Sequence, residues 1–454
     1  MASKPSIPSS PLAGIGATWW LLLMGAWLGV ALVKLGNPVI LDDKVQAPSG
    51  VLEWMFQPWP LRWGWTILGV VVALGVVFRQ LRLKNCRSFW FWAPALWLLW
   101  QCAAASTTVD QTLTQVTLAH FAVCTLLFYL GVSGHRLENS AKASFLWGLL
   151  LGFLFVLWIG LDQHFGGLEA TRKLIKEQPG WENLPKEYLK RINSDRIFAT
   201  LVYPNALAGA ILLLLPVMLW AVLRRLYRYS FVFRSVAVGM LAYLGAACLV
   251  WSGSKAGWLL AFVLIAVWLW HLDWLSRYRG IIVAIVGILG VCLFFVKYSS
   301  YFQRGATSVG ARMDYWNAGM RTFFQRPVFG SGPGTFSVMY RAAKSPESEM
   351  ALLAHNDFLQ QGSDSGVIGF LLYLFVFPAG VIRLYRQSRR DHQTFALWLG
   401  LLGWTLQGFV EFGLYIPALS STAFFFLGWL QGMEPSTESG QTRFDTEMTK
   451  RSKS

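Results

Sequence analysis

Residues 206–223 read ALAGAILLLLPVMLWAVL, and Arg224 and Arg225 follow them directly. About 20 apolar residues in a helix cross the hydrocarbon core of a bilayer, so this stretch predicts a membrane-spanning helix that ends at a basic loop. The whole chain has the same character, since 55% of its 454 residues are hydrophobic and only 14% are charged. A soluble protein carries about 25% charged residues. The composition therefore excludes an ordinary cytosolic enzyme and any disordered or fibrous chain, and it predicts a polytopic membrane protein.

Eleven further apolar ranges of similar length predict an all-α protein with about twelve transmembrane helices. The expected spans lie near residues 17–36, 63–79, 88–105, 113–132, 143–162, 206–223, 235–252, 256–271, 281–297, 364–383, 395–411 and 415–433. We expect residues 1–433 to form a single transmembrane domain. Residues 434–454 are polar and rich in Ser and Thr, which is typical of a disordered tail.

The placement of Lys and Arg predicts the orientation of these spans. The loops after every second span are basic, and they contain Arg79, Arg82, Lys84 and Arg87, then Arg136 and Lys142, then Arg224, Arg225, Arg228 and Arg234, then Arg277 and Arg279, then Arg383, Arg386, Arg389 and Arg390. Loops rich in Lys and Arg stay in the cytoplasm, so we expect both termini to be cytoplasmic. This topology also explains the net charge of +16 without a nucleic-acid partner.

Two long segments are expected on the opposite, extracytoplasmic side, at residues 163–205 and, between spans 9 and 10, at residues 298–363. The predicted cytoplasmic loops are much shorter. Long connections in a compact protein are usually functional or disordered. Any chemistry is therefore expected on the outer face.

The most informative outer motif reads HNDFLQQG at residues 355–362, followed by SDSGVIGF at 363–370. Histidine is the side chain best suited to move a proton near neutral pH, so His355 is a candidate general base. A polar residue at the interface can also simply cap a helix, and this alternative stays open for Asn356.

Cationic residues surround this motif in the sequence. Arg312 and Arg321 precede a turn that reads GSGPG at residues 330–334, which is either a plain turn or one that brings backbone N–H groups to an anion. Arg196 begins the stretch RIFATLVYPN, and Lys255 lies in the short turn SGSKAG between two spans. A cation in such a turn is costly unless it reaches water or binds a partner.

Taken in order, these motifs resemble the O-antigen ligase and polymerase superfamily of bacterial envelopes. The pattern is R…YPN.LA, then S-x-S-[RK] between two spans, then R…W, P..G.G..F and HN..L…G..G. The resemblance covers roughly residues 190–390 by motif and the whole chain by its twelve-span plan with a large late outer loop. The chain departs from the family at Lys255, where the family usually has Arg. Lysine keeps the charge but cannot form the bidentate contact of a guanidinium.

The resemblance implies a GT-C-like membrane glycosyltransferase of the bacterial inner membrane with its active site facing the periplasm. It implies transfer of a glycan from an undecaprenyl-diphosphate carrier to an acceptor hydroxyl on a lipid or saccharide, with inversion at the anomeric carbon. His355 is then the residue that takes or orients the acceptor proton. The residues expected to bind the diphosphate are Arg196, Lys255 and Arg312 by motif, Arg321 by proximity, and Asn356, which can instead position His355 or cap a helix.

This scheme needs no metal or other cofactor, and the sequence has no DxD motif and no cluster of His and carboxylate residues on the predicted outer face. A polysaccharide polymerase or a protein O-oligosaccharyltransferase of the same superfamily remains an alternative, since only the acceptor differs. A small-solute transporter of the bicarbonate type is a further alternative. Transporters place charged groups near the middle of the membrane, whereas the motifs here gather at the outer ends of the spans.

The orientation predicts which cysteine variants an impermeant thiol reagent labels in intact cells. A single cysteine at Ser345, in the segment 298–363, should be labelled without permeabilisation, whereas native Cys86, in a predicted cytoplasmic loop, should not. Labelling of the Ser345→Cys variant only after permeabilisation would overturn the assignment.

Overall fold

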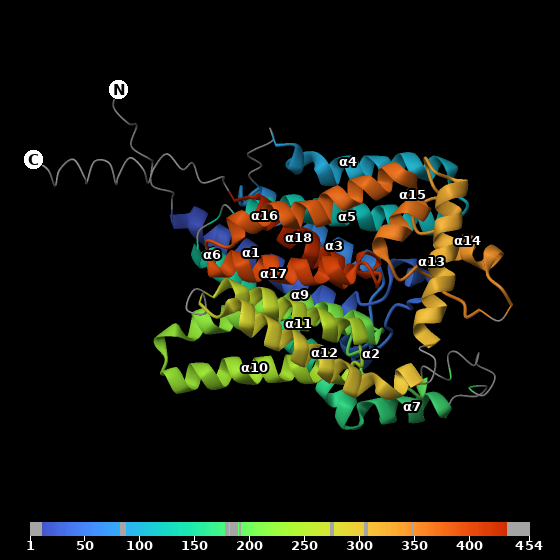
Figure 1. Cartoon of the computed structure of the whole chain (residues 1–454). Coiled ribbons are helices and arrows are strands. Elements are labelled where there is room, and N and C mark those ends of the chain that lie inside the picture. The colour runs from blue at the N-terminus through green and yellow to red at the C-terminus, as the bar shows by residue number, and fades with distance from the viewer. Residues whose placement is uncertain are drawn as a thin grey trace, which may run out of the picture.

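The structure is a computed structural model, and it describes residues 11–433 except 82–87, 136, 138, 178–180, 182–188, 190–191, 273–276, 304–306 and 347. The basic residues Arg82, Lys84, Arg87 and Arg136 and the predicted tail 434–454 lie outside the described residues. The described residues form helices and connecting turns, and no strand occurs among them (Figure 1).

A helix occupies each of the twelve ranges in which a span is expected. These helices are α1 (Pro11–Lys34), α3 (Leu61–Val77), α4 (Phe89–Ala104), α5 (Gln111–His135), α6 (Asn139–Asp162), α9 (Pro204–Arg225), α10 (Phe231–Trp251), α11 (Lys255–His271), α12 (Arg279–Gln303), α15 (Asp357–Leu374), α17 (His392–Gln407) and α18 (Pro417–Gln431).

Seven helical segments of the described chain are long and apolar enough to cross a membrane. They are Gly14–Lys34, Gln111–His135, Ala141–Lys173, Pro204–Arg228, Phe231–Trp251, Arg279–Ser299 and Asp357–Ser388. The expectation of an all-helical polytopic membrane protein is therefore confirmed, while the number of twelve crossings stays a prediction. The other expected spans are helices of 15 to 17 residues, close to the lower limit for crossing a bilayer.

Further helices occupy the connections. They are η1 (Val39–Lys44), α2 (Val51–Phe56), η3 (Gln163–Gly167), α7 (Leu168–Lys176), α13 (Thr307–Gln325) and α14 (Phe336–Ala343), and α16 (Gly380–Ser388) continues α15 through η7 (Phe375–Ala379). The long helices form a bundle, and α13 runs across one end of it with α14 beside it (Figure 1). The predicted outer segment 298–363 therefore covers one end of the bundle.

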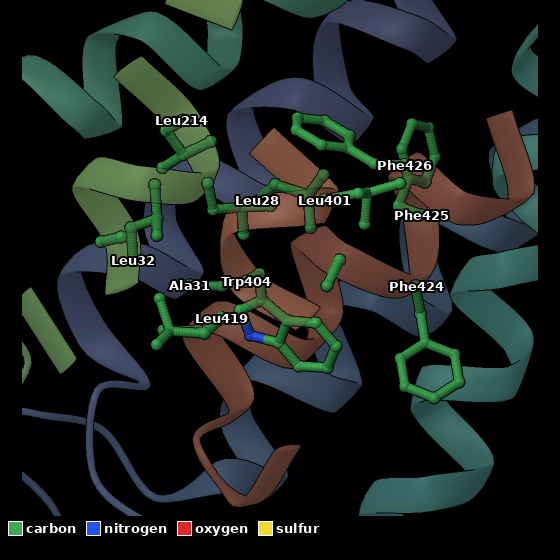
Figure 2. Close-up of a cluster of buried hydrophobic side chains, with 14 of the residues drawn as sticks. Leu28, Ala31, Leu32, Leu214, Leu401, Trp404, Leu419, Phe424, Phe425 and Phe426 are labelled. Atoms are coloured by element: carbon green, nitrogen blue, oxygen red, sulfur yellow. The ribbon is translucent and has the colours of Figure 1, made fainter. Parts of the chain in front are cut away.

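The core is built where helix backbones approach closely at small residues. On α1, a Cβ atom at Gly29 would lie 2.8 Å from the carbonyl oxygen of Gly148 on α6, and a Cβ at Gly152 would collide with Gly29 itself. Small residues allow such contacts, and van der Waals packing then holds helices together in a membrane. In the core, buried side chains of α1, α9, α17 and α18 pack together, among them Leu28, Leu214, Leu401 and Phe425 (Figure 2).

This packing gathers particular helix ends. Because successive spans reverse direction, α9, α11 and α15 all begin, and α17 ends, at the end of the bundle that α13 covers. The basic ends of α5, α9, α11 and α16 lie at the other. The sequence motifs with candidate functional residues are thus brought to one end of the bundle.

The contact between α1 and α6 predicts a large effect of Gly29→Leu on stability. Overfilling a packed site costs about 1–3 kcal/mol, and here the obstacle is backbone that cannot rotate away. We expect a melting temperature in detergent several degrees below that of the wild type. Gly239→Leu on α10 is the matched control, because no atom lies within 4 Å of a Cβ at that position. An equal effect of the two substitutions would contradict this account.

Candidate functional site

The buried carboxylate of Glu411 joins three segments at the end of the bundle that α13 covers. Glu411 lies in the turn between α17 and α18, and its side chain is 7% exposed. Its Oε1 accepts hydrogen bonds from Arg312 Nη2 and, at 2.6 Å, from Asn205 Nδ2. Its Oε2 lies 3.1 Å from His355 Nδ1. One carboxylate therefore connects α13, the start of α9 and the segment that leads into α15.

Arg196 reaches the same cluster through Asn205. The Arg196 guanidinium donates from Nη2 to Asn205 Oδ1 at 2.7 Å and from Nε to the carbonyl oxygen of Ser252 at 2.7 Å. Lys255, at the start of α11, is close enough for the charges of Arg196 and Arg312 to act on it. Its Nζ lies 5.4 Å from the centre of the Tyr298 ring. Two guanidinium groups and the Lys255 amine thus gather at this end of the bundle, with the Glu411 carboxylate beside Arg312 and within reach of the charge of Arg196.

The local backbone explains how Arg196 attains its position. Gly253 has a φ of +59°, and a Cβ there would lie 3.1 Å from Arg196 Nε, so glycine both forms the turn and leaves room for the guanidinium. On the other side, Gln163 Oε1 accepts the N–H groups of Phe198 and Ala199 at 2.9 and 2.8 Å. The turn between α10 and α11 and the side chain of Gln163 therefore hold the Arg196 segment from both sides.

His355 is held by the first turn of α15. Asn356 is the N-cap of this helix, and its Oδ1 accepts the N–H of Leu359 at 2.9 Å. The N–H of Asp357 donates to the carbonyl oxygen of Gly408 at 2.7 Å, which ties α15 to the segment that carries Glu411. The edge of the His355 ring meets Phe412, with the ring centres 4.7 Å apart. The imidazole stays 26% exposed, so it is fixed in place and still accessible.

The charges of the cluster keep Glu411 ionised. Burial on its own raises the pKa of a carboxyl group, but His355, Arg312 and Arg196 oppose it and hold the pKa of Glu411 below its ordinary value. Burial lowers the pKa of Arg196, and the charge of Glu411 acts in the opposite direction. An ionised Glu411 fixes the tautomer of a neutral His355, because Nδ1 must then carry the proton that Oε2 accepts. Nε2 is consequently the ring nitrogen that can accept a proton.

The structure brings four of the six proposed site residues together: Arg196, Lys255, Arg312 and His355. Asn356 is adjacent, but its side chain caps α15. Arg321 does not join them, because it follows Arg312 by nine residues on α13, and at about 100° per residue this places it on the opposite face of the helix. There Arg321 lines a separate open hollow with Asn317 and Phe324.

The GSGPG turn is a packing element. The N–H groups of Ser331 and Gly332 donate to the carbonyl oxygens of Ser363 and Asp364 at 3.0 and 2.9 Å. The N–H of Gly334 donates to Asp364 Oδ2 at 2.9 Å. Because these groups are used to dock the turn against α15, the structure favours the plain turn over the anion-binding one. In the described part of the chain, no three His, Cys, Asp or Glu side chains are grouped so that they could hold a metal ion.

Sequence reasoning missed Glu411 and left Asn205 without a role. A signal for Glu411 was present, because it is the only acidic residue between positions 395 and 433. An ionisable residue in an apolar stretch is by default a functional candidate. Asn205 belongs to the YPN motif, and its part in the site became clear only from its contacts with Arg196 and Glu411.

One comparison with known proteins bears on this arrangement. The family model described as O-antigen ligase matches residues 240–374, a segment that contains Lys255, Arg312 and His355. The resemblance to the O-antigen ligase superfamily is confirmed for these residues. No curated protein matches the chain. Arg196, Asn205 and Glu411 lie outside the matched segment, so their assignment to the site rests on the motif and on the geometry.

The lowered pKa of Glu411 predicts a pH-dependent effect of Glu411→Gln on stability. A carboxyl group whose folded-state pKa lies below its ordinary value of 4.5 stabilises the fold above that pH, and the stabilisation disappears as the pH falls through the folded-state pKa. In detergent at pH 7, Glu411→Gln should therefore melt below the wild type, and the difference should shrink on acidification below pH 4.5.

The control for this measurement is Glu177→Gln, which removes an exposed carboxylate. It should leave the melting temperature close to that of the wild type at both pH values. Equal melting of wild type and Glu411→Gln at pH 7, or a difference that grows on acidification, would contradict the charge arrangement described here.

Proposed function

We propose that this protein transfers a glycan from an undecaprenyl-diphosphate carrier to an acceptor hydroxyl at the outer face of the bacterial inner membrane. The observation that carries the proposal is the contact of the buried Glu411 carboxylate with His355, beside Arg196, Lys255 and Arg312. The O-antigen ligase family supports glycan transfer of the ligase or polymerase type.

In the proposed reaction His355 is the general base. Glu411 accepts the Nδ1 proton, and Nε2 of His355 takes the proton from the acceptor hydroxyl. As that oxygen bonds to the anomeric carbon from the opposite face, the bond between this carbon and the diphosphate oxygen breaks, and configuration at the carbon inverts. The ionised Glu411 stabilises the imidazolium that forms, as the carboxylate does in other carboxylate–histidine pairs.

Arg196, Arg312 and Lys255 stabilise the leaving group. Negative charge on the diphosphate grows as the glycosidic bond breaks, and donors held in place beforehand lower the free energy of that transition state. Arg196 is held by Asn205 and by the Ser252 carbonyl, so little reorganisation is needed when the donor binds. With side-chain cations in this role, we propose a reaction that does not depend on a metal ion.

Placement of the site favours this function over solute transport. The cluster lies at helix ends, in turns and under α13, rather than at broken helices in the middle of the bundle. The basic helix ends lie at the other end of the bundle. By the positive-inside rule, we propose that the site faces the periplasm and that both termini are cytoplasmic.

The direct test is to incubate the purified protein with an undecaprenyl-diphosphate oligosaccharide and to measure released undecaprenyl diphosphate. Separate reactions contain a lipid A-core acceptor, a saccharide acceptor or an acceptor protein, which distinguishes a ligase from a polymerase and from a protein O-oligosaccharyltransferase. Release that depends on one of these acceptors supports the proposal. No release with any of them contradicts it.

Replacing His355 should remove most of this activity. A general base contributes about 10²–10⁴-fold, so we expect His355→Ala to slow transfer by that factor in the assay above. His355→Gln should not restore the rate, because an amide donates and accepts hydrogen bonds but does not take up the proton. His355→Gln still offers an N–H donor to Glu411 and should melt near the wild-type temperature, whereas His355→Ala leaves Glu411 without this contact and should melt lower, so the rates are compared per folded protein. Near-normal transfer by His355→Gln would show that His355 only positions the acceptor.

The two faces of α13 provide a matched pair for the leaving-group contacts. A charge-assisted hydrogen bond is worth roughly 1.5–3 kcal/mol, so Arg312→Ala and Arg196→Ala should each lower the rate about ten- to a hundredfold. Arg321→Ala, on the opposite face of α13, should have little effect, and Lys255→Arg should keep or improve activity. Equal losses in Arg321→Ala and Arg312→Ala would refute the arrangement.

A further inference from the structure

A second cationic cluster lies at the other end of the bundle, around a cavity of about 1170 Å³. The cavity is lined by the end of α5 with the start of α6, by the end of α9 and the turn after it, by the start of α17, and by Trp429 of α18. These segments contribute Lys142, Arg224, Arg225 and Arg228, with Asp391 as the one acidic residue among the lining side chains. The cavity is therefore strongly positive.

Asp391 is already engaged in the fold. Its side chain caps α17, and Oδ2 accepts the N–H of Thr394 at 3.0 Å. One carboxylate cannot balance four cations in any case. Arg224, Arg225 and Arg228 are exposed to solvent, so their charges are available to an anionic ligand that enters the cavity.

Part of the cavity wall is apolar and aromatic. Leu146 and Leu150 of α6 are buried there, and Trp147 and Trp220 lie beside them. The Arg225 guanidinium lies 5.8 Å from the centre of the Trp147 ring. A soluble anion needs no such walls, whereas a molecule with both a charged group and apolar chains matches both parts of the lining.

The neighbouring outer surface is suited to acyl chains. Leu151 follows on α6 with 67% exposure, and Leu223 on α9 is 46% exposed. Both helices have spans long enough to cross a bilayer. Leu151 and Leu223 directly follow and precede the lining residues Leu150 and Arg224, so exposed apolar helix surface adjoins the cavity.

We propose that this cavity binds an anionic phospholipid, with the phosphate at Arg224, Arg225 and Arg228 and the acyl chains along α6 and α9. Guanidinium groups match the geometry of phosphate oxygens, and basic pockets between transmembrane helices suit anionic head groups. This cavity is separate from the Glu411 cluster, so lipid binding there can be tested independently of the proposed glycan transfer.

The test compares lipid retention by the full-length protein in native mass spectrometry. The protein is purified in detergent with added phosphatidylglycerol or phosphatidylcholine. The cavity variant is Arg224→Gln, Arg225→Gln and Arg228→Gln combined. The control combines Arg277→Gln, Arg386→Gln and Arg389→Gln, which removes the same charge from the same end of the bundle outside the cavity.

We expect the wild type and the control to retain phosphatidylglycerol in preference to phosphatidylcholine. The cavity variant should bind phosphatidylglycerol at least about tenfold more weakly, because each lost contact to a phosphate is charge-assisted. Equal retention of the two lipids by the wild type, or equal losses in the two triple variants, would overturn the proposal.

Two further measurements cover a triple variant that does not fold and a site that binds free phosphate. If the triple variant does not fold, Arg225→Gln alone should still weaken retention of phosphatidylglycerol, and an unchanged retention would count against the site. Inorganic pyrophosphate should raise the melting temperature less than phosphatidylglycerol does. An equal rise with pyrophosphate would show a site for a free phosphate instead of a lipid.

Discussion

The pairing of Glu411 with His355, Arg312 and Asn205 is the constraint on which the end of the bundle under α13 depends. A buried carboxylate costs several kcal/mol unless charged and hydrogen-bonding groups surround it. Three cations within reach of one another would likewise repel if no carboxylate lay among them. The cations offset the cost of burying the carboxylate, and the carboxylate offsets the repulsion between the cations. These contacts hold α13, the start of α9 and the start of α15 in one arrangement.

Close packing of α9 against α17 positions this cluster relative to the rest of the bundle. At Gly400 the backbone of α17 touches α9, since a Cβ there would collide with the carbonyl oxygen of Leu213. Nearer the site, Gln407 Nε2 donates to the carbonyl oxygen of Asn205 at 2.8 Å. The same two helices thus set the distance between Asn205 and the turn that carries Glu411. Rigid helix contact and polar pairing act together to preorganise the site.

The positions of the helices could be predicted from the sequence, because apolar runs without charge have few alternatives to a buried helix. Arg196, Lys255, Arg312 and His355 could be found because they lie in ordered motifs on one predicted face. Arg321 was expected at the site because it is close to Arg312 in the sequence. It does not join the site, because nine residues of helix turn its side chain to the opposite face. Glu411 forms its contacts with residues far away in the sequence, and no local pattern encodes them. The GSGPG turn has the sequence of an anion-binding loop, but tertiary packing uses its N–H groups.

The central claim is that Glu411 acts on catalysis through His355. The most direct measurement is the rate of undecaprenyl diphosphate release by His355→Ala, Glu411→Gln and the double variant, with folding of each checked by its melting temperature. If Glu411 works through the imidazole, the double variant is no slower than His355→Ala alone, because a glutamine still offers Oε1 to Arg312 and Asn205 and the imidazole that Oε2 orients is gone. If the two losses multiply in the double variant, Glu411 and His355 act independently, and the account is contradicted.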